Sequence, residues 1–511
     1  MWCKLITLVL ILVLILPLLA SCGGSDEDII HPPTPRTTTP ETVTETPTEI
    51  TETTAPTVKT DSTPRLTPVT FPDKELEEEI RQELDKEAGE VIWAEELTKL
   101  DTLYASRSRI TDLTGLEHCS GLTFLWLDGN QITDISPLSS LTRLMQLSVY
   151  GNYITDISSL SSLSRLTDLT LGDNLISDLS PLSSLTNLTS LSLWKNQISN
   201  LSPLSSLTNL TRLNLSQNDI TDISPLSNLT SLTSLDLYRN EISDLLPLSS
   251  LTSLTSLQLS ESFITDITPL SSLTSLTELK LWDNQIRDIS PLSPLTSLTS
   301  LNIGSNQIMD ISPLSSLINL DILWIEDNQI TDLSPLSSMT KLRHLHISGE
   351  NIMDISPLSS LINLERLWIS GTQISDVSPL SSLTNLEVLS LRSSKLSDLS
   401  PLSSMTTLTY LYLDNNGISN ISPLSSLINL TVLDLENNDI SDISPLRHLI
   451  KLEELDLENN QITDLSPLLT NTGLSDGDII YLRDNPLSDT SLNEHIPYLE
   501  ERGVNVSLSW R

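Results

Sequence analysis

A group of five carboxylates in the last third of the chain has residue types and spacing that could support chemistry. Asp414, Glu436 and Glu458 recur every 22 residues, and Asp434 and Asp456 recur at the same interval. If residues 22 apart are neighbours in space, these side chains form one acidic surface. Like charges on neighbouring strands cost stability, so the cluster predicts a basic partner or a Ca²⁺ ion, with a solvated acidic surface as the alternative.

A second acidic pattern precedes the segments of the type "DISPLSSL". In seventeen successive repeats from Asp112 to Asp464 this position is aspartate fifteen times, and Asn200 and Asn420 are the exceptions. A functional carboxylate is not needed fifteen times, so we expect each to accept a hydrogen bond from nearby backbone N–H groups. The following serine, such as Ser136, is expected to cap a short helical turn that begins at Pro137.

The remaining polar side chains do not form a catalytic constellation. His344 and His346 share one face of an expected strand, but no third ligand stands in register with them, so we expect solvated side chains rather than a metal site. The sequence contains no G-x-S-x-G, H-E-x-x-H or phosphate-binding loop. We therefore predict that the protein is not an enzyme.

All of these residues are positioned by one repeat. From Leu103 the motif L-x-x-L-x-L-x-x-N-x-I-x-D-I-S-P-L-S-S-L-T-x returns every 22 residues, and a last turn reaches Asn485, which gives eighteen coils. This period is typical of a leucine-rich repeat solenoid. We predict a right-handed α/β solenoid with a parallel sheet on the concave face, short 3-10 or α turns on the convex face, and a buried asparagine after each strand.

Aromatic residues occupy expected outward positions of this sheet. Alternation along a strand places Leu191 and Leu193 inside and Trp194 outside, on the concave face. Exposed rings are typical of docking surfaces, but duplication of a 44-residue unit, or rings that cover the leucine core, would give the same pattern. The predicted partner-binding residues are Trp126, Tyr150, Trp194, Tyr238, Trp282, Trp324, Trp368 and Tyr412, with Arg366 and Arg392 beside them.

The two ends of the composition argument concern charge and export. A formal net charge of -39 argues against nucleic acid, whose binders neutralise phosphates with Lys and Arg. The chain begins "MWCKLITLVLILVLILPLLASCGG", in which an apolar run after one lysine is typical of an export signal, with a retained membrane anchor as the alternative. Residues 22–70, rich in Thr, Pro and Glu, are predicted to form a disordered stalk.

Two resemblances extend these predictions. The "LASC" at 19–22 resembles the lipobox of bacterial lipoproteins, which implies a signal peptide at 1–21 and lipidation of Cys22. The unit "NQITDISPLSSLTNLTSLSL" resembles the repeats of bacterial internalin-like proteins. That resemblance implies a helical N-terminal cap at 71–100, a solenoid at 101–489, a C-terminal cap at 490–511, and a curved surface scaffold that binds a macromolecule through its concave sheet.

Together these patterns predict a monomeric, non-enzymatic binding protein, lipid-anchored on the extracellular face of a bacterial membrane. The expected partner of the concave face is a protein. A cell-envelope or extracellular polysaccharide is the alternative ligand, and a structural surface spacer is the alternative role. No cofactor is expected apart from the possible Ca²⁺ at the acidic surface.

Overall fold

The computed structural model describes residues 67–508. The predicted signal peptide (1–21), Cys22 and the stalk as far as residue 66 lie outside this range. Within it, every helix is too short or too polar to cross a lipid bilayer.

A small cap precedes the repeats. It consists of β1 (Pro68–Val69), α2 (Lys74–Glu83), β2 (Ile92–Trp93) and α3 (Ala94–Leu97), and β1 pairs with β2 in antiparallel fashion. Helix α2 begins after Asp73, whose carboxylate accepts hydrogen bonds from the N–H groups of Glu75 and Leu76. Pro68 and Val69, which we had placed in the stalk, belong to the cap because Val69 is buried against it.

The solenoid contributes one short strand per coil to a single parallel sheet. Strands 22 residues apart pair in register, for example Ser234 with Ser256, as far as β19; the last two steps are longer, and β20 pairs with β21 through Ile479 and Asn505. The strands are β3 (Thr102–Tyr104), β4 (Phe124–Trp126), β5 (Gln146–Ser148), β6 (Asp168–Thr170), β7 (Ser190–Ser192), β8 (Arg212–Asn214), β9 (Ser234–Asp236), β10 (Ser256–Gln258), β11 (Glu278–Lys280), β12 (Ser300–Asn302), β13 (Ile322–Trp324), β14 (His344–Ser348), β15 (Arg366–Ser370), β16 (Val388–Arg392), β17 (Tyr410–Tyr412), β18 (Val432–Asp434), β19 (Glu454–Asp456), β20 (Ile479–Tyr481) and β21 (Asn505–Ser507).

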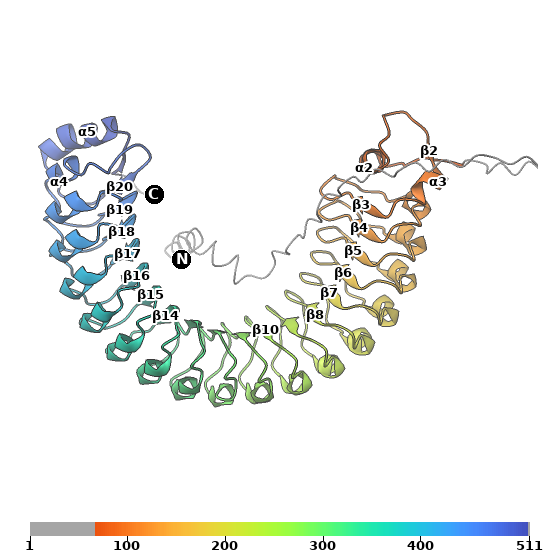
Figure 1. Cartoon of the computed structure of the whole chain (residues 1–511), viewed down its shortest axis with the longest axis horizontal. Coiled ribbons are helices and arrows are strands. Elements are labelled where there is room, and N and C mark those ends of the chain that lie inside the picture. Colours follow the sequence, from red (N-terminus) through yellow and green to blue (C-terminus); the bar gives the residue numbers. More distant parts are fainter. Residues whose placement is uncertain (1–66, 509–511) are drawn as a thin grey trace, which may run out of the picture. The chain divides into compact units, whose positions relative to one another are not determined.

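Residues 67–508 follow an arc with the strands on its inner side and the short helical turns on its outer side (Figure 1). Strands β3 and β20 lie near the opposite tips of this arc. The predicted fold class is therefore confirmed. The turns are 3-10 helices of three to five residues, from η1 (Leu116–His118) and η2 (Ser136–Ser140) to η16 (Ser444–His448), followed by the single-turn helix α4 (Ser466–Leu469).

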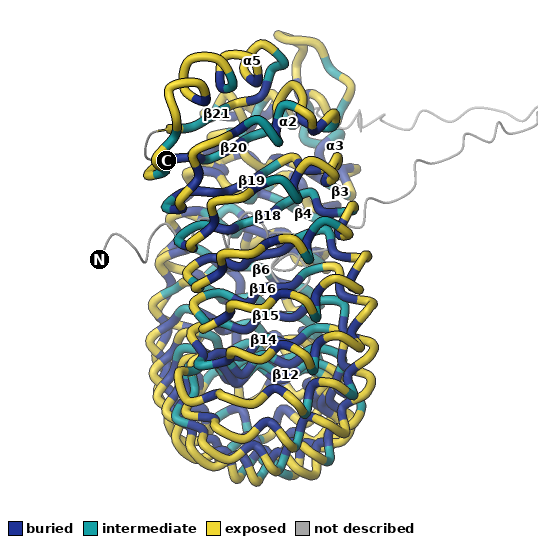
Figure 2. The backbone as a smooth tube through the Cα atoms, turned by 90° about the vertical axis from the view of Figure 1, so that its left-hand side faces the viewer, coloured by how far each residue is buried: buried dark blue, intermediate teal, exposed yellow. Residues whose placement is uncertain are grey.

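The core is a continuous stack of Leu and Ile. In the coil of β7, Leu191 is 1% exposed and Leu193, Ile198 and Leu204 are fully buried, and the same positions are buried in the neighbouring coils. Figure 2 shows buried positions repeating along the backbone from one end of the solenoid to the other. Because a single coil cannot enclose its own leucines, stability comes from the stacking of neighbours.

The aspartate before each turn, rather than the serine, supplies the cap. In the coil of η2, Asp134 Oδ1 accepts the N–H of Ser136 at 2.8 Å, and Asp134 Oδ2 accepts the Ser136 hydroxyl at 3.0 Å. The expectation that Ser136 caps the turn is wrong, because Ser136 is already the first residue of the 3-10 helix. The structural role that we predicted for the repeated aspartates is confirmed.

The C-terminal end closes the stack with a helix and one further strand. The predicted cap at 490–511 contains a π-helical turn (Ser491–His495), α5 (Ile496–Glu501) and β21, and β21 continues the parallel sheet beyond β20. Leu499 and Val504 are buried against the last coil, so the cap covers the leucines that the end of the solenoid would otherwise expose.

Candidate binding surface on the concave face

An asparagine ladder fixes the turn after each strand. Asn196 donates from Nδ2 to the carbonyls of Leu171 and Leu193 at 3.0 and 3.1 Å, and its Oδ1 accepts the N–H of Ile176 at 2.9 Å. The amide thus satisfies backbone groups of two adjacent coils, as predicted for this position. The geometry sets the level at which concave side chains emerge.

The ladder lapses in three successive coils, at Glu350, Thr372 and Ser394. Strands β14, β15 and β16 are five residues long there, whereas the other strands of the solenoid have three. Thr372 is buried and its hydroxyl lies 2.8 Å from that of Ser394, which replaces part of the lost hydrogen bonding. The most irregular coils therefore lie in the second half of the arc.

Two rows of concave positions carry the aromatic residues. The strand row is the third residue of each strand, and it includes Trp126, Trp324, Trp368 and Tyr412. The turn row stands two positions later in each coil, and it includes Tyr150, Trp194, Tyr238 and Trp282. Leu191 and Leu193 lie in the core and Trp194 is partly exposed, so the predicted alternation is confirmed.

Large and small residues alternate along the turn row. The indole of Trp194 lies against Gly172 of the preceding coil, where an added Cβ would stand only 2.1 Å from Trp194 Nε1. The ring reaches across that glycine to Tyr150, at a centroid distance of 6.4 Å. Each ring therefore covers the width of two coils. The row runs Tyr150, Gly172, Trp194, Ser216, Tyr238, Ser260, Trp282 and Gly304, and Tyr238 and Trp282 form the second pair at 6.1 Å.

This alternation gives the 44-residue step a packing reason. Ser260 is fully buried and Ser216 nearly so, which shows that small residues are needed beneath or beside the rings. The rings themselves remain partly exposed. The turn row is thus both a cover for the sheet and an apolar surface that a partner can contact.

At the first coils the strand row forms a separate stack. Trp126 lies parallel to Tyr104 at a centroid distance of 4.4 Å and to Phe124 at 6.0 Å. Tyr104 is about half exposed, at 52%. The aromatic surface therefore extends to the edge of the cap.

In the middle of the arc, two tryptophans flank a buried histidine. Trp324, His346 and Trp368 are in register on β13, β14 and β15, and the His346 ring lies 6.1 Å from that of Trp368. His346 Nδ1 stands 3.6 Å from a carboxylate oxygen of Glu326. Burial raises the pKa of Glu326 to about 7 and lowers the pKa of His346 to about 4, so the two groups do not form an ion pair near neutral pH.

Tyr412 and Arg392 do not present the free surface that we predicted for them. Tyr412 is only 5% exposed, because the Arg392 guanidinium lies over its ring at 4.5 Å. Arg392 also pairs with Asp414 at 2.8 Å and with Asp434 at 3.2 Å. Arg366, by contrast, is in register with His344 on the concave sheet and is partly exposed.

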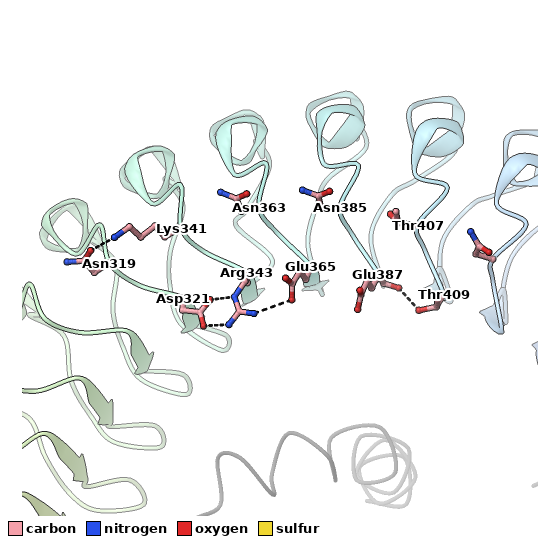
Figure 3. Close-up of a pocket in the computed structure, with 11 residues that line it drawn as sticks. Asn319, Asp321, Lys341, Arg343, Asn363, Glu365, Asn385, Glu387, Thr407 and Thr409 are labelled. Atoms are coloured by element: carbon pink, nitrogen blue, oxygen red, sulfur yellow. Dashed lines mark hydrogen bonds and ion pairs between the residues drawn. The ribbon is translucent and has the colours of Figure 1, made fainter.

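A groove of about 830 Å³ runs along one flank, where the chain passes from the 3-10 turns into β13–β17. Figure 3 shows its lining residues in two parallel lines that cross successive coils. It lies where Asp321, Arg343, Glu365 and Glu387 replace the threonine that most other coils carry just before the strand. Arg343 is held by both carboxylate oxygens of Asp321, at 2.6 Å each.

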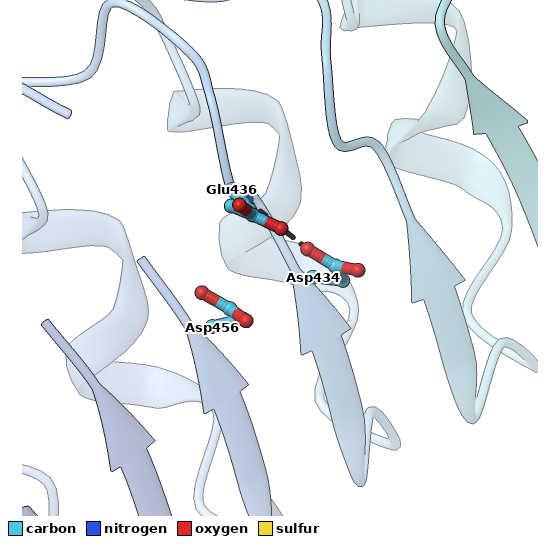
Figure 4. Close-up of side chains that lie close together, drawn as sticks. All are labelled: Asp434, Glu436 and Asp456. Carbon is cyan, nitrogen blue, oxygen red and sulfur yellow. Dashed lines mark hydrogen bonds between the residues drawn. The ribbon is translucent and has the colours of Figure 1, made fainter. Parts of the chain in front are cut away.

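The acidic cluster forms as predicted, but two arginines enter it. Ligand atoms of Asp434, Glu436 and Asp456 lie within 4.8 Å of one another (Figure 4). Arg392 binds the cluster on one side, and Arg483 pairs with Glu458 at 2.9 Å on the other.

Electrostatics in this cluster favour protonation. Burial, followed by Asp414 and Asp456, holds the pKa of Asp434 well above its ordinary value, against the opposing effect of Arg392. Burial and Glu458 raise the pKa of Glu436 in the same way. The carboxylates therefore repel one another despite the arginines.

Comparison with known proteins assigns the repeats. The family model for leucine-rich repeats in two copies matches residues 98–140, 186–228, 208–250, 230–272, 274–316, 318–360, 362–404, 406–448 and 428–470. An internalin of Listeria monocytogenes (InlF) is 38% identical, with a TM-score of 0.58, over 68% of this chain and 97% of its own. The chain belongs to the internalin-like leucine-rich repeat proteins.

Two further solved structures share the architecture of this internalin-like chain. The functional domain of InlJ from Listeria monocytogenes, which includes a cysteine ladder, is 26% identical over 82% of this chain and 83% of its own, with a TM-score of 0.60. A leucine-rich repeat protein of Leptospira interrogans is 24% identical over 81% of this chain and 97% of its own, with a TM-score of 0.56. Comparison with curated protein sequences finds no match.

Sequence reasoning missed two features of this internalin-like surface. Glu326 follows Trp324 by two residues, so its place in the turn row beside small Gly304 was available as a signal. The flank groove was signalled by the replacement of threonine at four successive repeats, from Asp321 to Glu387. Both lie in or next to the coils in which the asparagine ladder lapses.

Repulsion in the acidic cluster gives a testable prediction. Replacing Glu436 with glutamine and Asp456 with asparagine is expected to raise the Tm in calcium-free buffer by about 2 °C, because two like charges are removed while the amides keep the carboxylate shapes. Differential scanning calorimetry measures the change. We propose Ca²⁺ as the ion for this cluster if the wild type, but not the variant, gains Tm when CaCl₂ is added; an unchanged Tm in both buffers would show that the cluster is simply solvated.

Proposed function

We propose that this internalin-like protein is a non-enzymatic, lipid-anchored cell-surface protein that binds a protein partner through its concave face. The observation that carries the proposal is the partly exposed aromatic surface of the strand and turn rows. Rings are enriched at docking sites, and solenoids of this kind present a long concave surface for extended contacts. Lipidation of Cys22 would tether the solenoid to the outer side of the membrane.

The rings at the centre of this surface are Trp194, Trp282, Trp324 and Trp368. They come from four coils of the arc, so a partner that contacts all of them must span much of the concave sheet. Arg366, on the same sheet as Trp368, adds a positive group to a mainly acidic surface. Such a mixture of rings and a few charges supports recognition of a folded or extended polypeptide rather than a featureless spacer role.

The test is a comparison of binding by variants of the full chain. Replacing Trp194, Trp282, Trp324 and Trp368 with alanine is expected to abolish capture of partners from a cell-surface protein extract, because buried interface rings commonly contribute about 2 kcal/mol or more each. Pull-down with mass spectrometry detects the partners, and a glycan array run in parallel detects a polysaccharide.

A matched control removes rings outside the two rows. Tyr153, Phe263 and Tyr498 are each about half exposed, and the first two follow the ladder position, where the chain has left the sheet. Their replacement with alanine should leave capture intact. Equal capture by the wild type and both variants would contradict the proposal and favour a spacer, whereas loss of a glycan signal alone would assign the rings to polysaccharide binding.

A further inference from the structure

The flank groove is lined by two residues from each of several successive coils. One line contains Asn319, Lys341, Asn363, Asn385, Thr407 and Asn429, and the other, two residues later in each coil, contains Asp321, Arg343, Glu365, Glu387 and Thr409. Figure 3 shows these lines between the 3-10 turns and the strands. The groove is therefore a surface distinct from the concave aromatic rows.

The asparagine amides of the first line face one way. Asn363 donates from Nδ2 to the Thr340 carbonyl at 2.7 Å, and Asn385 donates to the Ile362 carbonyl at 2.9 Å. Each amide nitrogen thus bonds the preceding coil. The amide oxygen is left on the side of the following coil, as Figure 3 shows for both residues.

The chain itself shows what that oxygen binds. The Lys341 ammonium donates to Asn319 Oδ1 at 2.7 Å, and the Lys451 ammonium donates to Asn429 Oδ1 at 2.8 Å. In both cases the lysine comes from the same line in the next coil. After Asn363 and Asn385 the next coils carry Asn385 and Thr407 instead, so within residues 67–508 these two oxygens have no ammonium group.

A carboxylate accompanies each of these open oxygens. Glu365 and Glu387 follow Asn363 and Asn385 by two residues and line the same groove. Arg343 is committed to Asp321 and approaches Glu365 only at 3.6 Å, and Glu387 has no ion-pair partner among the described residues.

The comparison within the solenoid makes this combination specific. Asn187 and Asn209 bond the preceding coil in the same way, but Thr189 and Thr211 follow them, and these hydroxyls donate to backbone carbonyls. An amide oxygen with a nearby carboxylate and no internal cation therefore distinguishes the coils of β15 and β16.

We propose that the flank groove binds lysine side chains of a basic protein segment, with one ammonium group at Asn363 and Glu365 and another at Asn385 and Glu387. An ammonium group has three donors and no acceptor, which matches a site that offers amide and carboxylate oxygens. A neutral glycan fits less well because its hydroxyl oxygens also need donors, and the Thr407 and Thr409 hydroxyls already donate to backbone carbonyls.

The test measures binding of a fluorescent hexa-lysine peptide to the full chain by anisotropy at about 0.15 M salt, where long-range attraction to the acidic surface is screened. Glu365→Gln with Glu387→Gln is expected to weaken binding about tenfold. Asn363→Thr with Asn385→Thr is expected to weaken it about threefold. The threonine can keep the bond to the preceding coil, as Thr407 does with the Thr384 carbonyl at 2.7 Å, but lacks the amide oxygen.

The control variant removes the same charge from exposed positions outside the groove, through Glu241→Gln and Glu453→Gln, and should change binding less than about twofold. Equal weakening by the control and groove variants would overturn the proposal, because it would show attraction to overall charge. Absence of hexa-lysine binding, or groove-dependent binding of maltohexaose instead, would also overturn it. Because the Trp residues are untouched, these outcomes are independent of the concave proposal.

Discussion

Replacing Asn460 with alanine is expected to reduce the free energy of unfolding by about 2–4 kcal/mol. Asn460 is 2% exposed, donates from Nδ2 to the carbonyls of Leu435 and Glu458 at 2.9 and 3.0 Å, and accepts the N–H of Ile440 at 3.0 Å. Alanine leaves these backbone groups without partners in a site closed to water, which costs far more than the loss of an exposed hydrogen bond. Urea unfolding followed by circular dichroism measures the change.

The matched control is Asn187→Ala. Asn187 is exposed and makes one hydrogen bond, to the Ser164 carbonyl at 2.8 Å, so its loss is expected to cost less than about 1 kcal/mol. If the two variants lost equal stability, the buried ladder would not be the feature that holds adjacent coils together.

The 22-residue period was sufficient to predict the strands, the buried leucines and the asparagine ladder. Each of these follows from a constraint that every coil shares: Leu191 and Leu193 alternate with outward residues, and Asn196 sits where backbone groups of two coils need partners. A repeated constraint leaves the same residue at the same position, so periodicity alone reports it.

Contacts that depend on side-chain direction could not be predicted in the same way. Trp194 was placed correctly on the concave face, but its lean across Gly172 toward Tyr150 depends on a rotamer and on the space in the neighbouring coil. The burial of Tyr412 beneath Arg392 has the same origin. The alternation of rings with glycine and serine was visible in the sequence and would have indicated the lean.

Long side chains also changed the interpretation of the acidic cluster. Column positions correctly brought Asp434 and Asp456 together, and the cost of their repulsion follows from that placement. Arg392, however, comes from β16 and reaches Asp434 on β18 across an intervening strand. A column diagram places Cβ atoms but does not show how far a guanidinium extends.

Glu326 gives the stability a pH dependence that can be isolated by substitution. Burial raises the pKa of Glu326 from the ordinary 4.5 to about 7, so the folded state holds a proton that the unfolded chain has released. The stabilising contribution of the protonated carboxyl is fully present below about pH 4.5 and is lost as the pH rises toward about 7. Glu326→Gln, which resembles the protonated form, is therefore expected to be more stable than the wild type at pH 8 by on the order of 3 kcal/mol, and equal to it at pH 4.

The comparison of the two proteins at each pH cancels the titration of other groups, including the acidic cluster. His346 does not offset the effect, because burial lowers its pKa to about 4 and leaves it neutral where Glu326 ionises. Urea unfolding at pH 4, 6 and 8 measures the difference, and Glu241→Gln, at an exposed position, serves as the control with no expected pH-dependent gain. A Glu326→Gln variant that is less stable than the wild type at pH 8 would mean that the carboxylate is ionised and held by His346. In that case the centre of the concave face would carry an ion pair between its two tryptophans instead of two neutral groups.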